Sequence, residues 1–306
     1  AGSFLALLDS WAGNYRAAET ASRAAGAVVR EAELVWPMMF TQWSRGLVLT
    51  AMGAHDPAFE SFESALAVAE KLGDEIYRNR CLNSMGWLHA ECGDFDGSIA
   101  FNQKGVGVSR ERGDPETIAN SELNLGDAFL AKGDAVLASD MFAGVHGLVN
   151  KPATSDWMKW RYSQHLFAGL GETWLVLDDP AKAEDFCNQC LDLAAPTDSR
   201  KYLARGWRLK GEIAVARRQW DDARAALEKA LEFAVRIGNP TQLWKTHAAR
   251  GRYFRATGGL EAMAESLSAA EDVIDRIGAA LATPALRDGF ARSPVLHQVR
   301  DSVAAE

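Results

Sequence analysis

Small residues recur along the chain in a register of about forty residues. Glycine stands at positions 46, 86, 126, 171, 211 and 251, and Ala6 lies forty residues before the first of them. Seven residues after each of these positions come Gly13, Gly53, Gly93, Gly133, Asp178, Arg218 and Gly258. Two further columns of mostly small residues follow at offsets of twelve and nineteen, beginning with Ala18 and Ala25. No stretch of useful length alternates polar and apolar residues with the period of two that a half-buried strand shows.

This register predicts one helical hairpin in each unit. The first small residue lets a helix approach a neighbouring backbone closely, and the residue seven later ends that helix and turns the chain. The two later columns are seven residues apart, so they lie along one stripe of the second helix. Six capping residues precede prolines and are expected to start helices, namely Asp56, Asp114, Asp179, Asn239, Thr283 and Ser293. The sequence therefore predicts an all-α fold, with seven hairpins over residues 1–283 and one or two capping helices in residues 284–306.

One unit carries a recognisable signature. Leu125-Gly126 through Gly133-Asp134, with Ala138 and Phe142, resembles the tetratricopeptide repeat (TPR), whose usual period is about 34 residues. The resemblance implies a right-handed superhelical solenoid whose concave face is lined by the first helix of each hairpin. The longer period seen in this chain would lengthen the helices.

The second half resembles a narrower group, the C-terminal sensor arrays of large bacterial signalling ATPases. These are adenylate/guanylate-cyclase-linked ATPases and regulators of the maltose-activator type. The strings that carry the resemblance are SDWMKWRYS at residues 155–163, SRKY at 199–202, NPTQLWKTH at 239–247 and LRDGFARSP at 286–294. The resemblance implies that the repeats receive a signal for an upstream ATPase-like effector domain of the same chain. Residue 1 falls inside the first helix without a cap, which predicts the C-terminal piece of a longer protein.

Composition narrows the partners that this array is expected to have. The formal net charge of −8 is the opposite of what a dedicated nucleic-acid binder carries. No apolar run reaches the roughly 18–20 residues that a membrane-spanning helix needs. Four cysteines in 306 residues do not make a disulfide framework, which favours a reducing cytoplasm. We therefore expect no nucleic acid and no membrane among the partners.

The expected concave face is cationic in its last three units. Residues spaced four and three apart share one face of each first helix, and in these units that face carries seven basic side chains against only Glu172 and Glu212. A guanidinium group binds carboxylates and phosphates through a two-pronged fork. The face therefore predicts an anionic ligand, either an acidic or C-terminal peptide segment or a phosphorylated or carboxylated metabolite. The alternative is an ordinary solvated face, in which Arg208 would pair with Glu212 one turn away.

Amides and aromatic rings on the same face favour a peptide. Asn83, Asn120 and Asn124 can hold an extended backbone, because a side-chain amide both donates and accepts hydrogen bonds. Trp87 and an aromatic stripe in the second unit, Trp36, Phe40 and Trp43, are expected to take an apolar part of the ligand. The predicted groove residues are Arg80, Asn83, Trp87, Asn120, Asn124, Asp127, Trp160, Arg161, His165, Lys201, Arg205, Arg208, Lys245 and Arg252.

Two motifs that resemble chemical sites have simpler explanations. Cys187 and Cys190 form a CxxC, but both fall on packing positions of a second helix and no other ligand pair completes a metal site. Arg112-Gly113-Asp114 fits a helix end followed by a helix start. No catalytic constellation, cofactor or metal is predicted. We expect a sensor or protein-interaction module that is not an enzyme; the alternative is a scaffold whose groove packs on its own upstream domain or on another copy.

Overall fold

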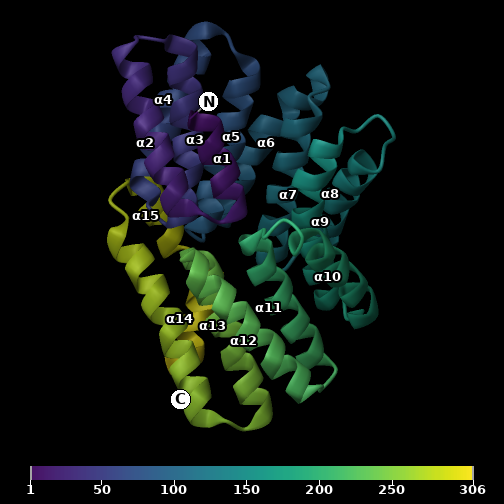
Figure 1. The fold of residues 1–306 in the computed structure, drawn as a ribbon. Coiled ribbons are helices and arrows are strands. Elements are labelled where there is room, and N and C mark those ends of the chain that lie inside the picture. The colour runs from purple at the N-terminus through teal and green to yellow at the C-terminus, as the bar shows by residue number, and fades with distance from the viewer. Residues whose placement is uncertain (1, 305–306) are drawn as a thin grey trace.

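The computed structural model describes residues 2–304, and its helices follow one another as antiparallel hairpins in a right-handed superhelix (Figure 1). The first helices of the hairpins are α1 (Gly2–Ala12), α3 (Val35–Met52), α5 (Glu75–Glu91), α7 (Pro115–Ala131), α9 (Asp156–Val176), α11 (Arg200–Ala216) and α13 (Pro240–Thr257). The second helices are α2 (Tyr15–Glu31), α4 (His55–Leu72), α6 (Phe95–Arg112), α8 (Ala135–Val149), α10 (Pro180–Ala194), α12 (Trp220–Ile237) and α14 (Leu260–Ala280). The predicted all-α hairpin fold is confirmed, and residues 2–304 contain no strand.

The residues predicted to turn the chain, seven positions after each small residue of the register, all adopt the left-handed backbone conformation. Their φ angles run from 58° at Arg218 to 86° at Gly133. Glycine adopts this conformation without a steric cost, whereas Asp178 and Arg218 hold it with a Cβ atom present. Each hairpin therefore turns at the same place in its unit, which keeps successive units in register.

Helix caps follow the sequence prediction at most proline positions. Gly113 ends α6 in the left-handed conformation, and the Asp114 carboxylate accepts hydrogen bonds from the first backbone N–H groups of α7. The prediction for Asp56 is wrong, because α4 begins one residue earlier, at His55. The Asp56 carboxylate instead accepts hydrogen bonds at 2.6 and 2.9 Å from the backbone N–H groups of Ala282 and Thr283.

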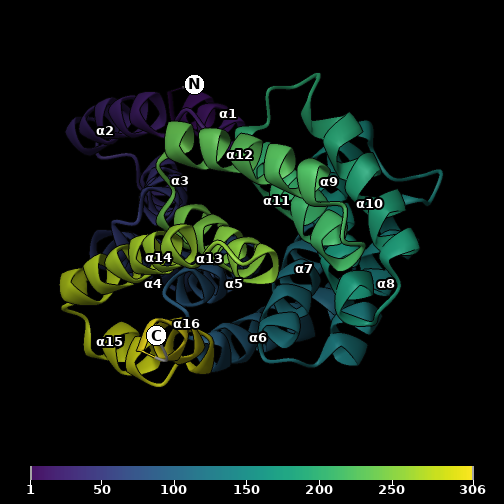
Figure 2. The same cartoon turned by 90° about the horizontal axis from the view of Figure 1, so that it is seen from below.

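The superhelix curls until its late units touch its early ones (Figure 2). Asn239, before α13, donates a hydrogen bond to the carbonyl of Ala51 in α3 at 2.9 Å. Arg200, at the start of α11, donates to the Asn14 side chain at 2.5 Å. Pro240 lies so close to Gly53 that a Cβ atom there would be 2.5 Å away. These contacts close the concave side into a channel bounded by the first helices.

The two remaining helices, α15 (Pro284–Ala291) and α16 (Pro294–Ala304), follow the seventh hairpin. They begin at the predicted prolines and pack against α14 and α6. Leu296 of α16 lies under Gly93, at the turn before α6. The division into a solenoid of residues 1–283 and a cap of residues 284–306 stays a prediction, and its outermost residues, 1 and 305–306, lie outside the described part.

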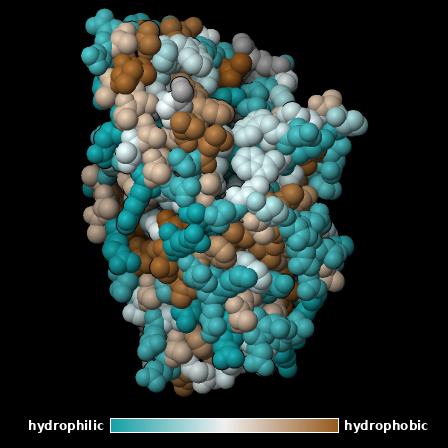
Figure 3. Space-filling view, in the orientation of Figure 1, coloured by the Kyte–Doolittle hydropathy of each residue, from teal (hydrophilic) through white to brown (hydrophobic). Residues whose placement is uncertain are grey.

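The outer surface is mixed in polarity. Figure 3 shows hydrophilic side chains over much of this view, with apolar surface over the N-terminal helices, where Phe4, Leu5 and Trp36 are about half exposed. Within residues 2–304, no helix combines the length and the apolar character needed to cross a bilayer.

The glycine column controls how closely paired helices approach. A Cβ atom at Gly126 would lie 2.6 Å from the Phe142 ring, which is completely buried between α7, α8 and α9. By contrast, a Cβ atom at Gly147 of α8 would meet no other side chain or neighbouring helix within 4 Å. The same chemical change therefore has opposite expected effects at the two positions.

We predict that Gly126→Ala lowers the free energy of unfolding by about 1–3 kcal/mol, because the added methyl overpacks the core. Gly147→Ala is the matched control and should raise it by up to about 1 kcal/mol through helix propensity. Urea denaturation followed by circular dichroism measures both. Equal stability of the two variants would contradict the close-approach account.

Candidate functional site

The channel contains two chambers, and the narrow throat between them is lined by residues of both. The first, here called the amide chamber, is built almost entirely from first helices. Its lining consists of Ser10 and Trp11 of α1, Tyr15 of α2, Leu47 and Ala51 of α3, Asn83, Ser84 and Trp87 of α5, Asn120 and Asn124 of α7, Trp160, Arg161, Gln164 and His165 of α9, and Ser199, Lys201 and Tyr202 at the start of α11.

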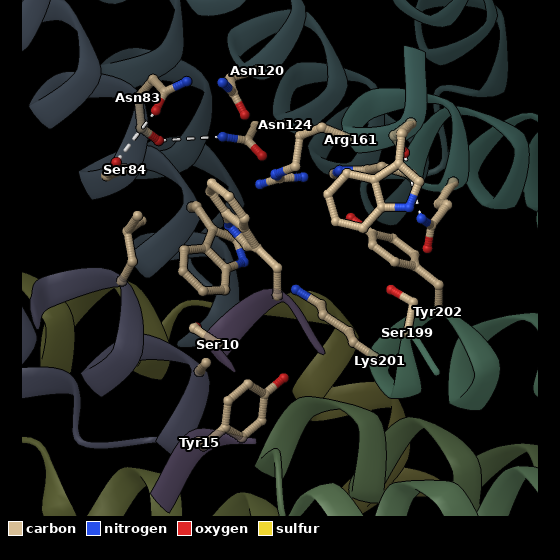
Figure 4. Close-up of a pocket in the computed structure, with 17 residues that line it drawn as sticks. Ser10, Tyr15, Asn83, Ser84, Asn120, Asn124, Arg161, Ser199, Lys201 and Tyr202 are labelled. Atoms are coloured by element: carbon tan, nitrogen blue, oxygen red, sulfur yellow. Dashed lines mark hydrogen bonds between the residues drawn. The ribbon is translucent and has the colours of Figure 1, made fainter. Parts of the chain in front are cut away.

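Three side-chain amides form one wall of the amide chamber (Figure 4). The Asn120 amide nitrogen donates to the Tyr162 hydroxyl at 2.8 Å, and the Asn124 amide nitrogen donates to the Asn83 carbonyl at 3.2 Å. These bonds hold both side chains in place through their nitrogens. Their carbonyl oxygens make no hydrogen bond within the described part of the chain, so they remain available as acceptors.

Polar atoms without partners surround the same space. Tyr15, Asn83 and Gln164 are buried, and the Tyr15 hydroxyl, the Asn83 amide nitrogen and the Gln164 amide oxygen find no hydrogen-bond partner among the described residues. Burial also raises the pKa of the Tyr15 hydroxyl, so this group is a neutral donor. An unpaired buried polar group costs about 1–3 kcal/mol, which a bound molecule with complementary groups would relieve. Figure 4 shows Tyr15 on the wall facing the asparagines.

Two cations lie among aromatic rings in the amide chamber. The Arg161 guanidinium stacks on Trp11 at 5.1 Å and on Tyr162 at 5.5 Å, and it makes no ion pair within residues 2–304. The Lys201 ammonium lies 4.7 Å from the Trp87 ring centre and 3.6 Å from a carboxylate oxygen of Glu91. Arg161 is therefore the cation of this chamber that can meet a ligand carboxylate without displacing a protein partner.

Glu91 is a buried carboxylate that the repeat pattern does not place on the groove face. It accepts hydrogen bonds from the Trp87 indole at 2.8 Å and from the Asn239 amide at 3.4 Å. Burial alone would raise the pKa of Glu91, but the charges of Lys201 and Lys245 and hydrogen bonds from Thr241 and Trp87 bring it below its ordinary value. An ionised Glu91 therefore ties Lys201 to the early units of the array.

The throat between the chambers is closed by a network of buried charges. Arg205 donates to both Asp127 oxygens, at 2.8 and 3.2 Å, and to both Glu172 oxygens, at 2.6 and 3.0 Å. Arg208 donates to Glu172 at 3.1 Å and to Gln242 at 2.8 Å. The network thus joins α7, α9, α11 and α13.

The charges of the network hold one another in their ionised forms. Burial opposes the charge on Asp127, yet Arg205 and His165 keep its pKa far below the ordinary value. The same carboxylates raise the pKa of Arg205 above its usual range. Burial lowers the pKa of His165, so its imidazole is neutral near pH 7 and donates a hydrogen bond to Asp127 at 2.7 Å.

The second space, here called the cationic chamber, has a volume of about 480 Å³ and lies beyond the throat. Its charged lining includes Lys245, Arg252, Glu212 and the network residues Arg205 and Arg208. Apolar side chains from six helices complete the wall, namely Phe95 of α6, Leu130 and Ala131 of α7, Leu175 and Val176 of α9, Trp244 and Ala248 of α13, Leu267 of α14, and Val295 and Val299 of α16. The C-terminal helix is therefore part of this chamber.

The structure brings thirteen of the fourteen predicted groove residues to the channel lining. Asn83, Trp87, Asn120, Asn124, Trp160, Arg161, His165 and Lys201 line the amide chamber, and Asp127, Arg205, Arg208, Lys245 and Arg252 line the cationic chamber. Arg80 stands apart, paired with Glu116 at 2.6 Å and stacked on Tyr77.

Two expectations about this face are wrong. The aromatic stripe does not line either chamber, since Trp36 and Phe40 stack on each other and Trp43 packs edge-on against Tyr77. Arg208 does not pair with Glu212 within its helix; Glu212 instead pairs with Arg252 of the next unit. Arg205 and Arg208 are only 7% and 4% exposed, which also contradicts the solvated-face interpretation at these two positions.

Sequence reasoning missed Trp11, Tyr15, Gln164, Tyr202 and Glu91. Gln164 and Tyr202 lie beside predicted positions, so a wider helix face would have included them. Tyr15 and Glu91 reach the channel only because the ends of the array meet, and no column of the repeat signals that.

The CxxC cysteines are packing residues in the structure. Cys187 and Cys190 are buried in α10, and burial raises the pKa of each thiol to about 12. The Cys187 thiol donates to the carbonyl of Gly206 at 3.3 Å. Among the described residues, no three His, Cys, Asp or Glu side chains are grouped to hold a metal ion.

Solved structures share this architecture at low sequence identity. A Rap protein complexed with competence and sporulation factor matches with a TM-score of 0.62 and 12% identity, over 99% of both chains. The Rap conjugation gene regulator of plasmid pLS20, in complex with the Phr* peptide, has a TM-score of 0.71 and 16% identity, over 93% of this chain and 75% of that one. NprR in complex with its cognate peptide NprX has a TM-score of 0.60 and 11% identity, over 95% of this chain and 85% of that one. No protein-family profile and no curated protein matches the chain. The likeness establishes a TPR-like helical-repeat fold.

We predict that Arg205→Met lowers the free energy of unfolding by at least about 2 kcal/mol, because it leaves the buried Asp127 carboxylate without a cation and Glu172 with Arg208 alone. Arg23→Met removes an exposed pair with Glu19 on α2 and should cost only about 0.3–0.5 kcal/mol. Urea denaturation at pH 7 compares the two. A similar, small loss for both variants would contradict the structural role of the throat network.

Proposed function

We propose that the chain is a recognition module that binds an extended peptide segment in the amide chamber. The observation that carries this proposal is the set of buried donors and acceptors without partners around Asn83, Asn120 and Asn124 in the described part of the chain. An extended peptide offers alternating N–H and C=O groups, which match amide side chains held in fixed orientations. The solved structures with the same fold support it, because three of them hold their protein in complex with a factor or a peptide.

An acidic group is part of the proposed ligand. Arg161 is held between aromatic rings, has no carboxylate partner among the described residues and points into the chamber (Figure 4). A side-chain or terminal carboxylate of the peptide would complete a charge-assisted hydrogen bond there. Trp87, Trp160 and Trp11 would cover the apolar part of the same peptide.

The proposed role of the module is to sense this ligand on behalf of an effector. The resemblance of residues 155–163 and 239–247 to bacterial sensor arrays supports an ATPase-like effector domain upstream in the same cytoplasmic protein. Ligand binding changes the effector only if the peptide binds one state of the whole protein more tightly than the other. The proposal assigns recognition rather than catalysis to this chain.

We predict that a defined library of seven-residue peptides with free C-termini contains acidic members that raise the melting temperature of the protein. For such a peptide, Arg161→Gln should weaken binding by about 10–100-fold, the range of one hydrogen bond to a charged group. Its affinity should also fall as salt concentration rises. Isothermal titration calorimetry gives both results.

Arg224→Gln is the matched control, since Arg224 lies on the exposed side of α12, 60% exposed. It should leave peptide affinity unchanged. The proposal fails if no peptide of the library binds, or if Arg161→Gln and Arg224→Gln bind equally. Under this proposal the protein need not self-associate. Association that increases with protein concentration and is lost in Arg161→Gln would instead favour the alternative function, a scaffold whose groove is filled by another copy of the chain.

A further inference from the structure

We propose that the cationic chamber is a second, separate binding site and that it takes an amphipathic carboxylate, meaning one acidic group on an aliphatic chain. The site goes beyond the peptide function and does not depend on it, because it lies on the other side of the buried charge network.

The charge requirement comes from Lys245. Its ammonium lies 5.6 Å from the Trp244 ring centre and makes no ion pair with any described residue. Burial and the charge of Arg208 lower the pKa of Lys245, although Glu172 and Asp127 act in the opposite direction, and neither carboxylate forms an ion pair with Lys245. Among the described residues, Lys245 therefore lacks a counter-charge in direct contact. An anionic group in the chamber would supply that counter-charge.

The other charges of the chamber limit the ligand to a single negative charge. Arg205 and Arg208 are bound to Glu172, and Arg252 is bound to Glu212. Arg255, also on the lining, donates a hydrogen bond to the Met263 sulfur at 3.4 Å. The two carboxylates face the same space and would repel a ligand with several negative charges. One carboxylate suits Lys245, whereas a polyphosphate would have to displace existing ion pairs.

The aliphatic requirement comes from the rest of the wall. Leu130, Leu175, Ala248, Val295 and Val299 surround the chamber, and its volume of about 480 Å³ falls in the usual range of small-molecule sites, about 300–1,000 Å³. Hydrocarbon that leaves water for such a wall gains about 0.8 kcal/mol per methylene group.

The scarcity of neutral hydrogen-bonding groups separates this site from the amide chamber. Gln298 of α16 is the single uncharged amide or hydroxyl side chain on the described lining, whereas the amide chamber has several. A peptide backbone would leave its own N–H and C=O groups unpaired here, and burying them without partners is unfavourable. A hydrocarbon chain has no such groups.

The C-terminal helix α16 forms part of the chamber wall, so a bound ligand would contact the last helix of the chain. Val295 and Val299 form one side of the wall, so a bound aliphatic chain would contact α16 directly. The same helix packs on α14 and touches the turn before α6 through Leu296. A ligand in the chamber therefore stabilises the docked position of α16.

Decanoate, 1-decanol and acetate are the probes that test the site, each titrated below the concentration at which it self-associates. We expect decanoate to bind with a stoichiometry of one, 1-decanol to bind at least about tenfold more weakly, and acetate not to bind detectably. Decanoate should also raise the melting temperature. Equal binding of decanoate and 1-decanol, or no binding of decanoate, would overturn the proposal.

Variants locate the bound molecule. Lys245→Met removes the charge and keeps an apolar chain of similar length, so decanoate affinity should fall about tenfold or more, whereas Lys71→Met on the exposed end of α4 should change nothing. Val299→Asp places a carboxylate on α16 against the ligand and should also weaken binding, with His297→Asp on the same helix as its control. Unchanged affinity in both chamber variants would overturn the assignment.

A third variant separates this proposal from the peptide function. Arg161→Gln lies in the amide chamber and should leave decanoate binding unchanged while it weakens acidic peptides. If Arg161→Gln abolished decanoate binding and Lys245→Met did not, decanoate would occupy the amide chamber, and the second site would be refuted while peptide recognition stood.

Discussion

The contact between the late and the early units of the array is the constraint on which the channel depends. A stack of hairpins alone gives an open concave face. Here Asn239, Arg200 and Asp56 join residues up to 227 positions apart through hydrogen bonds to backbone or side-chain groups. Because such groups are unfavourable when buried without partners, these bonds fix how the ends meet. The closure turns an open surface into two partly enclosed chambers.

Enclosure changes what the basic face can do. Charges removed from water need partners, so at least four of the seven inward cations of the last three units are bound to carboxylates of other units, as Arg205 is to Asp127 and Glu172. The groove face of the last three units is therefore less positive than the number of Lys and Arg residues on its helices implies. Recognition then depends on the few groups left without partners in the described part of the chain, Arg161 in one chamber and Lys245 in the other, and on the neutral amides around the first.

Features that recur in every repeat unit can be predicted from the sequence. Features that depend on the contact between the late and early units cannot. The turn at Gly133 and the packing of Gly126 on Phe142 follow from positions in a register, because the same local geometry recurs in every unit. Inward positions such as Asn120 and Lys201 follow from helix periodicity. Tyr15 and Glu91 do not, since they reach the channel through the pitch of the superhelix, which sums small rotations over many units.

Closure of the array is tested most directly by a disulfide between Asp56→Cys and Thr283→Cys, whose native residues are joined by a 2.9 Å hydrogen bond. The background is low, because the four native cysteines are buried and burial raises their thiol pKa values. Mild oxidation of the double variant should give an intramolecular cross-link in the folded monomer, seen as a mobility shift that a reductant reverses, and neither single variant should shift. Two reactive thiols that fail to cross-link in the folded protein would show an open array and contradict the enclosed channel.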